Sequence, residues 1–178
     1  MTNLGEKISD AEFNQLVDGL EQLRDAGKSH NDLKPGNILY KRNNGFEIRI
    51  SDFGQANKSG GTPGWTAPKF KNRQPGKEDV YSMGWVFLWM MCESKGLFYA
   101  LRDNFVENPN LQWVAKFRNL PEIQLVLKMT DLWNPLSVDD VKTEWIKIAP
   151  SVQLITKSRL RQLGVPPTSL KPQYKHTR

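Results

Sequence analysis

Cysteine is nearly absent from this chain: Cys92 is the only one among 178 residues. A single cysteine can form neither an internal disulfide nor a cysteine-rich zinc site, which predicts a reducing compartment, and we expect a cytoplasmic location. Long apolar runs are absent as well. The longest covers residues 80–92 and is shorter than the about 20 residues that a membrane-spanning helix needs, so we expect a buried helix and no membrane contact. The opening MTNLGEKISD also lacks the apolar core of a secretory leader.

Acidic residues are missing from residues 151–178, which carry six of the 25 basic side chains. Residues 1–150 therefore hold 19 basic and 19 acidic side chains, and the net charge of +6 lies entirely in the C-terminal segment. The end of that segment, GVPPTSLKPQYKHTR, has the composition of a disordered chain. We predict one domain over residues 1–155 and a basic, flexible tail over 156–178. Such a tail could contact an acidic partner, RNA or a membrane surface, and a role in solubility is favoured over these.

Apolar periodicity predicts a mainly α-helical domain with a small β-hairpin. Ser9 and Glu12 have the spacing of a capping box and precede apolar residues at helical spacing, so a helix is expected over 10–26, ended by Gly27. Two short strands are expected at 38–40 and 46–50, joined by a tight turn at Asn44-Gly45.

Further helices are expected in the second half of the chain. They are predicted near 80–94, after Pro109 with Leu111, Val114 and Phe117, near 122–130, and after Ser137 with Val138, Val141, Trp145 and Ile148. The six tryptophans are expected to pack in the core: Trp65, Trp85, Trp89, Trp113, Trp133 and Trp145.

The side chains that could bind a metal ion or transfer a proton are concentrated in two stretches, HNDLKPGNILY at 30–40 and SDFG at 51–54. An ionised Asp32 could accept a hydroxyl proton while the nearby Lys34 steadies a transferring phosphate. Asn37 and Asp52 offer the hard oxygen ligands that magnesium prefers. Any one of these residues alone would fit a surface loop of a turn-rich hairpin. The set in this order indicates a magnesium-phosphate site.

These stretches resemble the motifs of the eukaryotic protein-kinase family. HNDLKPGN is similar to the His-Arg-Asp catalytic loop and SDFG to the Asp-Phe-Gly magnesium motif. GTPGWTAPK at 61–69 resembles the loop that ends in Ala-Pro-Glu, and DVYSMG at 79–84 the start of the central buried helix. The resemblance covers residues 10–150 and implies the fold of the kinase C-lobe, the large lobe.

The resemblance also implies residue roles. Asp32 would be the catalytic base and Lys34 the phosphate-steadying lysine, with Thr62 bridging the two. Asn37 and Asp52 would hold magnesium. Leu39 would join those two in contacting the nucleotide. Lys34 favours Ser/Thr over Tyr substrates. Two structural roles follow as well: His30 and Phe53 would stack in the spine that links the two lobes, and Asp79 would accept hydrogen bonds from the backbone of the catalytic loop.

Parts of the family pattern are absent from these 178 residues. They contain no G-x-G-x-x-G loop, no strand lysine of the V-A-I-K type and no glutamate helix to pair with it. Asn31 replaces the arginine of His-Arg-Asp, and Lys69 replaces the glutamate of Ala-Pro-Glu. The glutamate's usual arginine partner is missing from 131–137 too, and losing both partners of an ion pair can be nearly neutral.

We therefore expect weak binding of Mg²⁺ and ATP and little phosphotransfer by this chain alone. The leading hypothesis is a pseudokinase-like C-lobe that acts by binding, as a decoy, inhibitor or scaffold, to another protein kinase, a kinase substrate or a second copy of itself. The alternative is the catalytic half of a Ser/Thr kinase completed by a small lobe in the same or another chain.

Two other classes remain open from the sequence. Small-molecule kinases of the aminoglycoside and choline type carry a similar His-Gly-Asp…Asn loop, but they lack counterparts of GTPGWTAPK and DVYSMG. A helical nucleic-acid binder would use the basic tail and leave the paired motifs unexplained.

Overall fold

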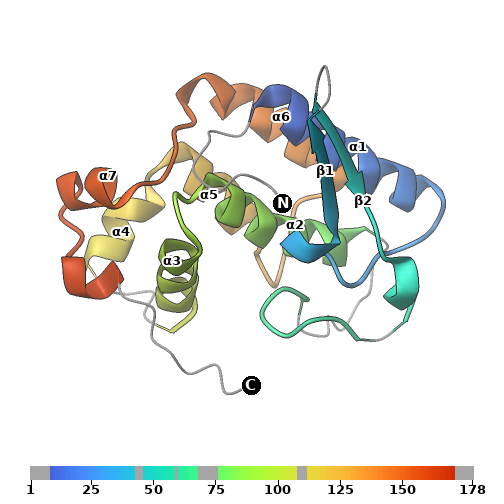
Figure 1. Ribbon diagram of the computed structural model, residues 1–178, viewed down its shortest axis with the longest axis horizontal. Coiled ribbons are helices and arrows are strands. Elements are labelled where there is room, and N and C mark those ends of the chain that lie inside the picture. Colours follow the sequence, from blue (N-terminus) through green and yellow to red (C-terminus); the bar gives the residue numbers. More distant parts are fainter. Residues whose placement is uncertain (1–8, 43–45, 59, 68–75, 108–111, 171–178) are drawn as a thin grey trace.

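The computed structural model describes residues 9–42, 46–58, 60–67, 76–107 and 112–170. Helices dominate, with one antiparallel hairpin, as predicted (Figure 1). The elements in chain order are α1 (Asp10–Asp25), β1 (Ile38–Arg42), β2 (Phe46–Ile50), α2 (Lys77–Met91), α3 (Lys95–Glu107), α4 (Gln112–Arg118), α5 (Pro121–Met129), α6 (Val138–Ile148) and α7 (Lys157–Gln162). Short 3₁₀ turns lie at Pro35–Asn37, Phe53–Gln55, Ala149–Ser151 and Pro167–Leu170.

Helix α2 is the centre of the core. From Val80 to Met91 only Tyr81 is not fully buried, because α3 and α5 pack against this helix and α1 reaches it through an aromatic stack. In that stack the ring of Phe13 lies 4.4 Å from Phe87 and 3.8 Å from Trp145, centroid to centroid, which joins α1, α2 and α6. A helix surrounded on all sides needs no polar face, which explains its unbroken apolar sequence.

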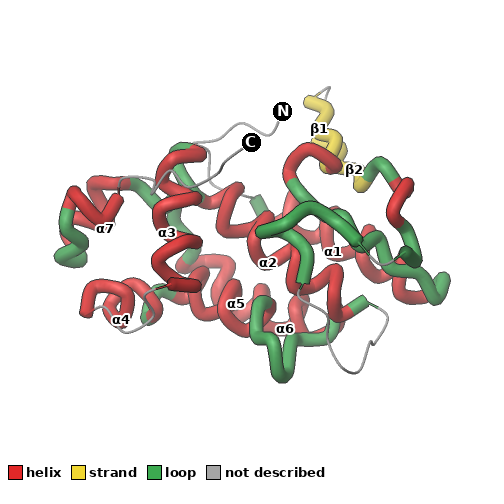
Figure 2. The backbone as a smooth tube through the Cα atoms, turned by 90° about the horizontal axis from the view of Figure 1, so that it is seen from below, coloured by secondary structure: helices red, strands yellow, loops and turns green. Residues whose placement is uncertain are grey.

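The hairpin packs one face on α1 and leaves the other outward. In its register Ile38 pairs with Ile50 and Tyr40 with Ile48, and these four side chains are buried or half-buried. The neighbouring pair, Leu39 and Arg49, is exposed, because successive strand residues alternate between the two faces of a sheet. Figure 2 shows both strands at one edge of the helical body, with α3, α4 and α7 grouped away from them.

Capping residues fix where α1 and α6 begin. Ser9 accepts from Glu12 N and Ser137 from Asp140 N, and each helix start closes a full capping box. At the other end of α1, Gly27 takes a φ of 65°, which suits glycine. The two helices therefore form almost where the sequence predicts them.

Helix α3 was not predicted, and the preceding helix was predicted too long, to about residue 94. The structure ends α2 at Met91 and starts α3 at Lys95, with Ser94 Oγ accepting from Leu97 N. Leu97, Phe98 and Leu101 then face the core. In the sequence, Ser94 as a capping residue and the helical spacing of these three apolar residues are the features that could have predicted α3.

The flexible tail predicted from residue 156 was wrong for residues 157–170. Helix α7 and the 3₁₀ turn after it bury Leu160, Val165 and Leu170 against the body. Three apolar anchors five residues apart match neither helical nor strand periodicity, which is why composition suggested disorder. Residues 171–178 lie outside the described residues.

Three smaller points complete the comparison with expectation. Trp133 is 96% exposed, so the prediction that it packs in the core was wrong, whereas the other five tryptophans are buried. The predicted turn at Asn44-Gly45, as well as Pro109 and Leu111, lies outside the described residues. In the described part of the chain no helix combines the length and apolar character needed to cross a membrane.

Candidate active site

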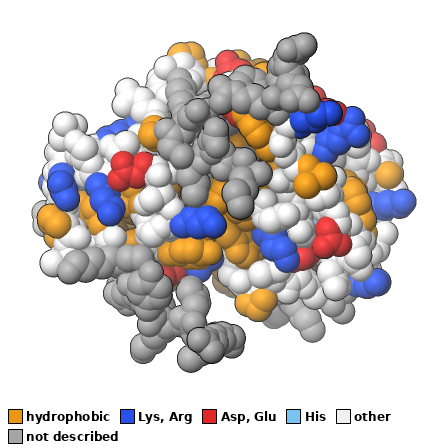
Figure 3. All heavy atoms as spheres, in the orientation of Figure 1, with side chains coloured by type: hydrophobic (Ala, Val, Ile, Leu, Met, Phe, Trp, Pro, Cys, Tyr) orange, Lys and Arg blue, Asp and Glu red, His pale blue; other side chains and the backbone are white. Residues whose placement is uncertain are grey.

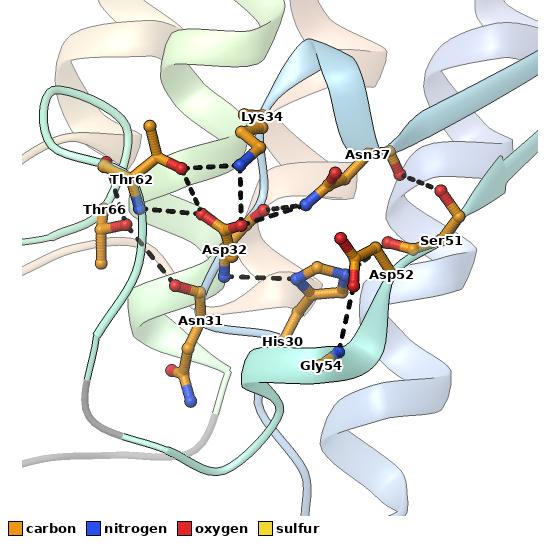
Figure 4. Close-up of polar contacts among 10 residues, drawn as sticks. All are labelled: His30, Asn31, Asp32, Lys34, Asn37, Ser51, Asp52, Gly54, Thr62 and Thr66. Carbon is orange, nitrogen blue, oxygen red and sulfur yellow. Dashed lines mark hydrogen bonds and ion pairs between the residues drawn. The ribbon is translucent and has the colours of Figure 1, made fainter.

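Asp32 lies at the centre of a hydrogen-bond network between the catalytic loop and the segment after β2 (Figure 4). Its Oδ1 accepts from the backbone N of Thr62 at 2.8 Å and from Thr62 Oγ1 at 2.7 Å. Its Oδ2 accepts from Lys34 Nζ at 2.9 Å and from Asn37 Nδ2 at 3.2 Å. Four donors thus fix the direction of a carboxylate that is only 8% exposed.

Lys34 and Thr62 also bond to each other, which closes a ring with Asp32. Lys34 Nζ donates to Thr62 Oγ1 at 2.7 Å. Burial alone would raise the pKa of Asp32, but the hydrogen bonds from Lys34 and Thr62 outweigh it and hold that pKa below its ordinary value. Asp32 is therefore ionised at neutral pH.

Asp79 on α2 holds the catalytic loop through hydrogen bonds from the loop's backbone. This carboxylate is 1% exposed and accepts from the backbone N of His30 at 2.7 Å and of Asn31 at 2.9 Å. Burial raises the pKa of Asp79, and the two backbone donors partly offset that effect. Asp79 therefore ties the loop that carries Asp32 to a helix that is buried along most of its length.

Asn37 and Asp52 present oxygen atoms from the two ends of the hairpin. Asn37 Nδ2 donates to the backbone O of Asp32 at 2.8 Å, which leaves its side-chain oxygen for another ligand. Asp52 adopts a left-handed conformation, φ 61°, and is exposed, with Oδ1 accepting from Gly54 N at 3.3 Å. Figure 4 shows its carboxylate facing the loop of Asp32 and Asn37.

Asn37 and Asp52 would suit a magnesium ion, which takes few ligands from the protein. They are too few for a metal ion that is coordinated by protein side chains alone. Among the described residues no group of three His, Cys, Asp or Glu side chains is placed to hold a metal ion. Mg²⁺ commonly takes one or two protein carboxylates and completes its shell with water and phosphate oxygens. Asn37 and Asp52 would hold such an ion against a nucleotide, where it would neutralise charge on the phosphates.

Ser51 joins the ends of the hairpin. Its N and Oγ both donate to the backbone O of Asn37, at 2.8 and 3.1 Å. The Nε2 atom of His30 lies 2.9 Å from the backbone O of Ser51, and the His30 ring lies 5.0 Å from that of Phe53 at an angle of 54°. Phe53 is nonetheless 50% exposed and Leu39 is 57% exposed, so both present apolar surface to solvent.

Sequence reasoning missed the residues that anchor Thr62 from α3. The Trp65 ring stacks on Phe98 at 5.1 Å, and Arg102 Nη1 donates to the backbone O of Gly64 at 3.3 Å. Gly64 has a φ of 82°, and a Cβ there would lie 2.9 Å from Arg102 Nη1. The pattern that would have revealed this anchor belongs to α3, the helix that was not predicted. Lys69 lies outside the described residues.

Comparison with known proteins agrees with this geometry. A family model described as "Protein kinase domain" matches residues 2–138. The chain belongs to the protein kinase family.

The relatives that it matches include proteins named as serine/threonine-protein kinases and as other protein kinases. It is 32% identical over 141 residues to a serine/threonine-protein kinase/endoribonuclease IRE1b of Arabidopsis thaliana, covering 67% of this chain and 15% of that protein. It is 28% identical to myosin light chain kinase 3 of Pongo abelii, over 83% of this chain and 20% of that protein. A calcium/calmodulin-dependent protein kinase type 1 of Macrobrachium nipponense is 36% identical over 49% of this chain and 28% of its own length. The chain thus spans less than a third of each of these relatives.

Proposed function

We propose that this polypeptide is a kinase C-lobe that acts by binding another protein kinase, with little phosphotransfer of its own. The observation that carries the proposal is the apolar surface beside the catalytic loop. Phe53 and Leu39 are exposed there, on the side of the hairpin and turn that a nucleotide and a covering lobe would occupy in the family. Exposed large apolar side chains commonly mark a protein contact where they belong to a contiguous apolar patch.

A groove between α1 and β2 extends this surface. It has a volume of about 630 Å³, and its lining includes Leu23, Ile50, Phe53 and Ala56. Its two charged lining residues, Lys28 and Arg49, are cations. An apolar segment flanked by acidic groups would therefore fit it best. On the face drawn in Figure 3, Lys and Arg side chains are spread among polar and apolar ones rather than gathered into one patch, which gives no support to nucleic-acid binding.

The second candidate function is catalysis with a small lobe supplied by additional polypeptide. The specific observation in its favour is the complete network around Asp32, which a pure scaffold does not need. Asp32 would take the proton of a Ser or Thr hydroxyl as that oxygen bonds to the γ-phosphorus of ATP. The bond from that phosphorus to the bridging oxygen would break, and ADP would leave. Lys34 would stabilise negative charge on the transferred phosphoryl group, and Asn37 and Asp52 would hold Mg²⁺.

Thermal stability with and without millimolar Mg-ATP tests whether this chain alone binds nucleotide. A ligand that binds only the folded state raises its stability by RT ln(1 + [L]/Kd). Since no phosphate-clamping loop is present in these residues, we expect almost no shift for the wild-type chain and none for Asp52→Asn. A magnesium-dependent rise of several degrees that Asp52→Asn removes would contradict the expectation of weak nucleotide binding.

A phosphotransfer assay on the same samples completes the test. We expect no transfer from Mg-ATP to a Ser/Thr protein substrate above that of Asp32→Ala. Transfer that Asp32→Ala abolishes would establish the catalytic candidate. The binding candidate is tested directly by adding the chain to a calcium/calmodulin-dependent protein kinase type 1 and measuring that enzyme's rate. Inhibition that Phe53→Ser weakens would support the proposal, and an unchanged rate at saturating chain would count against this class of partner.

A further inference from the structure

Trp133 is the most exposed large apolar residue in the part of the chain that the structure describes. It is 96% exposed, and Leu132 beside it is 45% exposed. Both lie between α5 and α6, where Asp131 Oδ1 accepts from the backbone N of Trp133 at 2.8 Å and from that of Asn134 at 3.1 Å. These two bonds close a turn, so the indole is held on a fixed backbone and loses little freedom on binding. We call residues 131–134 the tryptophan turn.

Asp131 gives the tryptophan turn a negative charge. Its Oδ1 takes both backbone bonds, which leaves Oδ2 for a donor from outside. The nearest charged residues along the chain are already paired, Lys128 with Glu144 and Asp139 with Arg24. A surface that complements this turn would therefore be apolar and would carry a cation.

The groove between α1 and β2 has this complementary character. It has a volume of about 630 Å³, within the range of sites that enclose a small ligand, and apolar side chains such as Leu23 and Ile50 line it. Its charged lining residues are the exposed cations Lys28 and Arg49. Arg49 pairs with Glu47, whereas Lys28 has no ion-pair partner among the described residues. Lys28 is therefore the cation that could meet Asp131.

A second groove, between the start of α1 and the end of α6, has the wrong charge. Its volume is about 530 Å³, and apolar residues such as Ile146 and Pro150 line it. Among its described lining residues only Asp10 is charged. Asp10 would face Asp131, and like charges oppose contact. Charge thus favours the groove between α1 and β2.

We propose that the tryptophan turn of one copy of this chain binds in the α1–β2 groove of a second copy, with Trp133 against the apolar lining and Asp131 beside Lys28. The proposal rests on the proposed function in using the same groove, and it adds a specific occupant. Within one copy Trp133 is exposed and is not part of that lining, so the contact joins different copies. Because turn and groove are separate surfaces, the contact is head-to-tail.

Two variants each remove one half of the contact. Trp133→Ser removes the indole and leaves the groove intact. Gln22→Glu/Lys28→Glu adds acid to the groove lining and leaves the turn intact, and both positions are exposed, so the fold should persist. In sedimentation velocity we expect the wild-type chain to self-associate as its concentration rises. Each variant alone should self-associate at least roughly tenfold more weakly, as for the loss of a central aromatic contact.

Mixing the two variants tests the pairing of turn with groove. The turn of Gln22→Glu/Lys28→Glu can enter the groove of Trp133→Ser, and neither chain has a second contact to offer. An equimolar mixture should therefore form pairs and nothing larger, with the affinity of a wild-type contact. A mixture that stays monomeric, or a wild-type chain that is monomeric up to about 0.1 mM, would overturn the proposal.

Asp131→Asn tests the charge by itself, because an amide oxygen can keep the two bonds that close the turn. Self-association should weaken and lose part of its dependence on salt. Wild-type affinity and salt dependence in Asp131→Asn would contradict the contact of Asp131 with Lys28.

Ile146→Ser is the control, because Ile146 is 74% exposed and lines the other groove. It should leave self-association unchanged. A loss as large as that of Trp133→Ser would mean general apolar association and would overturn the proposal. No other kinase enters these measurements. A monomeric chain that still binds another protein kinase would overturn this proposal alone, and self-association without kinase binding would count against the proposed function alone.

Discussion

At the scale of single residues, the candidate site depends on how one carboxylate is oriented. Asp32 receives hydrogen bonds from an ammonium, an amide, a hydroxyl and a backbone N–H. These donors keep the Asp32 carboxylate ionised despite its burial, and they fix its orientation. The same donors link its protonation to the stability of the fold.

Acid should destabilise the wild-type chain more than it destabilises Lys34→Met. The folded pKa of Asp32 is lowered, so its contribution to stability is present above the unfolded value of about 3.9 and is lost as pH falls through the folded pKa. Removing Lys34 takes away one of the bonds that lower this pKa. We expect a loss of about 1 kcal/mol at pH 7, since the pair is partly exposed.

Urea unfolding at pH 7, 5 and 3 measures this difference. The gap between wild type and Lys34→Met should narrow as the pH falls below 4. Lys41→Met, a change at an exposed position on β1, provides the control and should keep a constant offset. A gap that stays constant down to pH 3 would show that Lys34 does not govern the pKa of Asp32.

At the scale of elements, an ion pair joins α7 to α5. Glu122 on α5 is fully buried and pairs with Arg159 on α7, whose guanidinium also donates to the backbone O of Gln153. Within the described residues the second oxygen of Glu122 has no hydrogen-bond partner, so Arg159 supplies its main compensation.

Arg159→Met should therefore be strongly destabilising, by about 3 kcal/mol, because it leaves a buried carboxylate without its partner. The double variant Glu122→Met/Arg159→Met removes both charges and should recover most of that loss. Chemical denaturation of the three proteins gives the comparison. An Arg159→Met protein as stable as wild type would mean that the Glu122–Arg159 ion pair contributes nothing to the stability of the fold.

The elements that the sequence predicted best carry their own local signals. The capping boxes at Ser9 and Ser137 and the alternation from Ile38 to Tyr40 determine α1, α6 and the hairpin with little help from the rest of the molecule. The ordered motifs likewise located Asp32 and Asn37 within the site.

What the sequence could not predict depends on contacts between distant segments. Arg159 appeared as one of the basic residues of a tail, although its partner lies 37 positions earlier. The hydrogen bond from Asn31 to the backbone O of Lys58 could not be predicted for the same reason, because a backbone acceptor 27 positions away leaves no motif in the sequence. Exposed Trp133 shows the limit of composition, since an apolar residue type does not specify burial.

At the scale of the whole molecule, burial is uneven. Around α2 the core is continuous from α1 to α7, whereas the hairpin end presents Leu39, Phe53 and the groove lined by α1 and β2. Other exposed apolar residues lie on separate helices, such as Val106 on α3 and Ile146 on α6. The proposed contact residues, Leu39 and Phe53, can therefore be compared with Val106 and Ile146, which are exposed and apolar but lie elsewhere on the surface.

Leu39→Ser/Phe53→Ser should reduce association with another protein kinase at least tenfold while leaving the melting temperature within a few degrees of wild type. Burying two such side chains at an interface is worth about 1.5–3 kcal/mol each, enough for this loss.

Val106→Ser/Ile146→Ser is the matched control, because its side chains are at least as exposed. Titration calorimetry of each double variant against a calcium/calmodulin-dependent protein kinase type 1, with sedimentation to monitor self-association, makes the comparison. If both double variants lose affinity equally, the association is non-specific and depends on exposed apolar side chains in general rather than on Leu39 and Phe53. If only Leu39→Ser/Phe53→Ser loses it, the surface beside the catalytic loop is the contact.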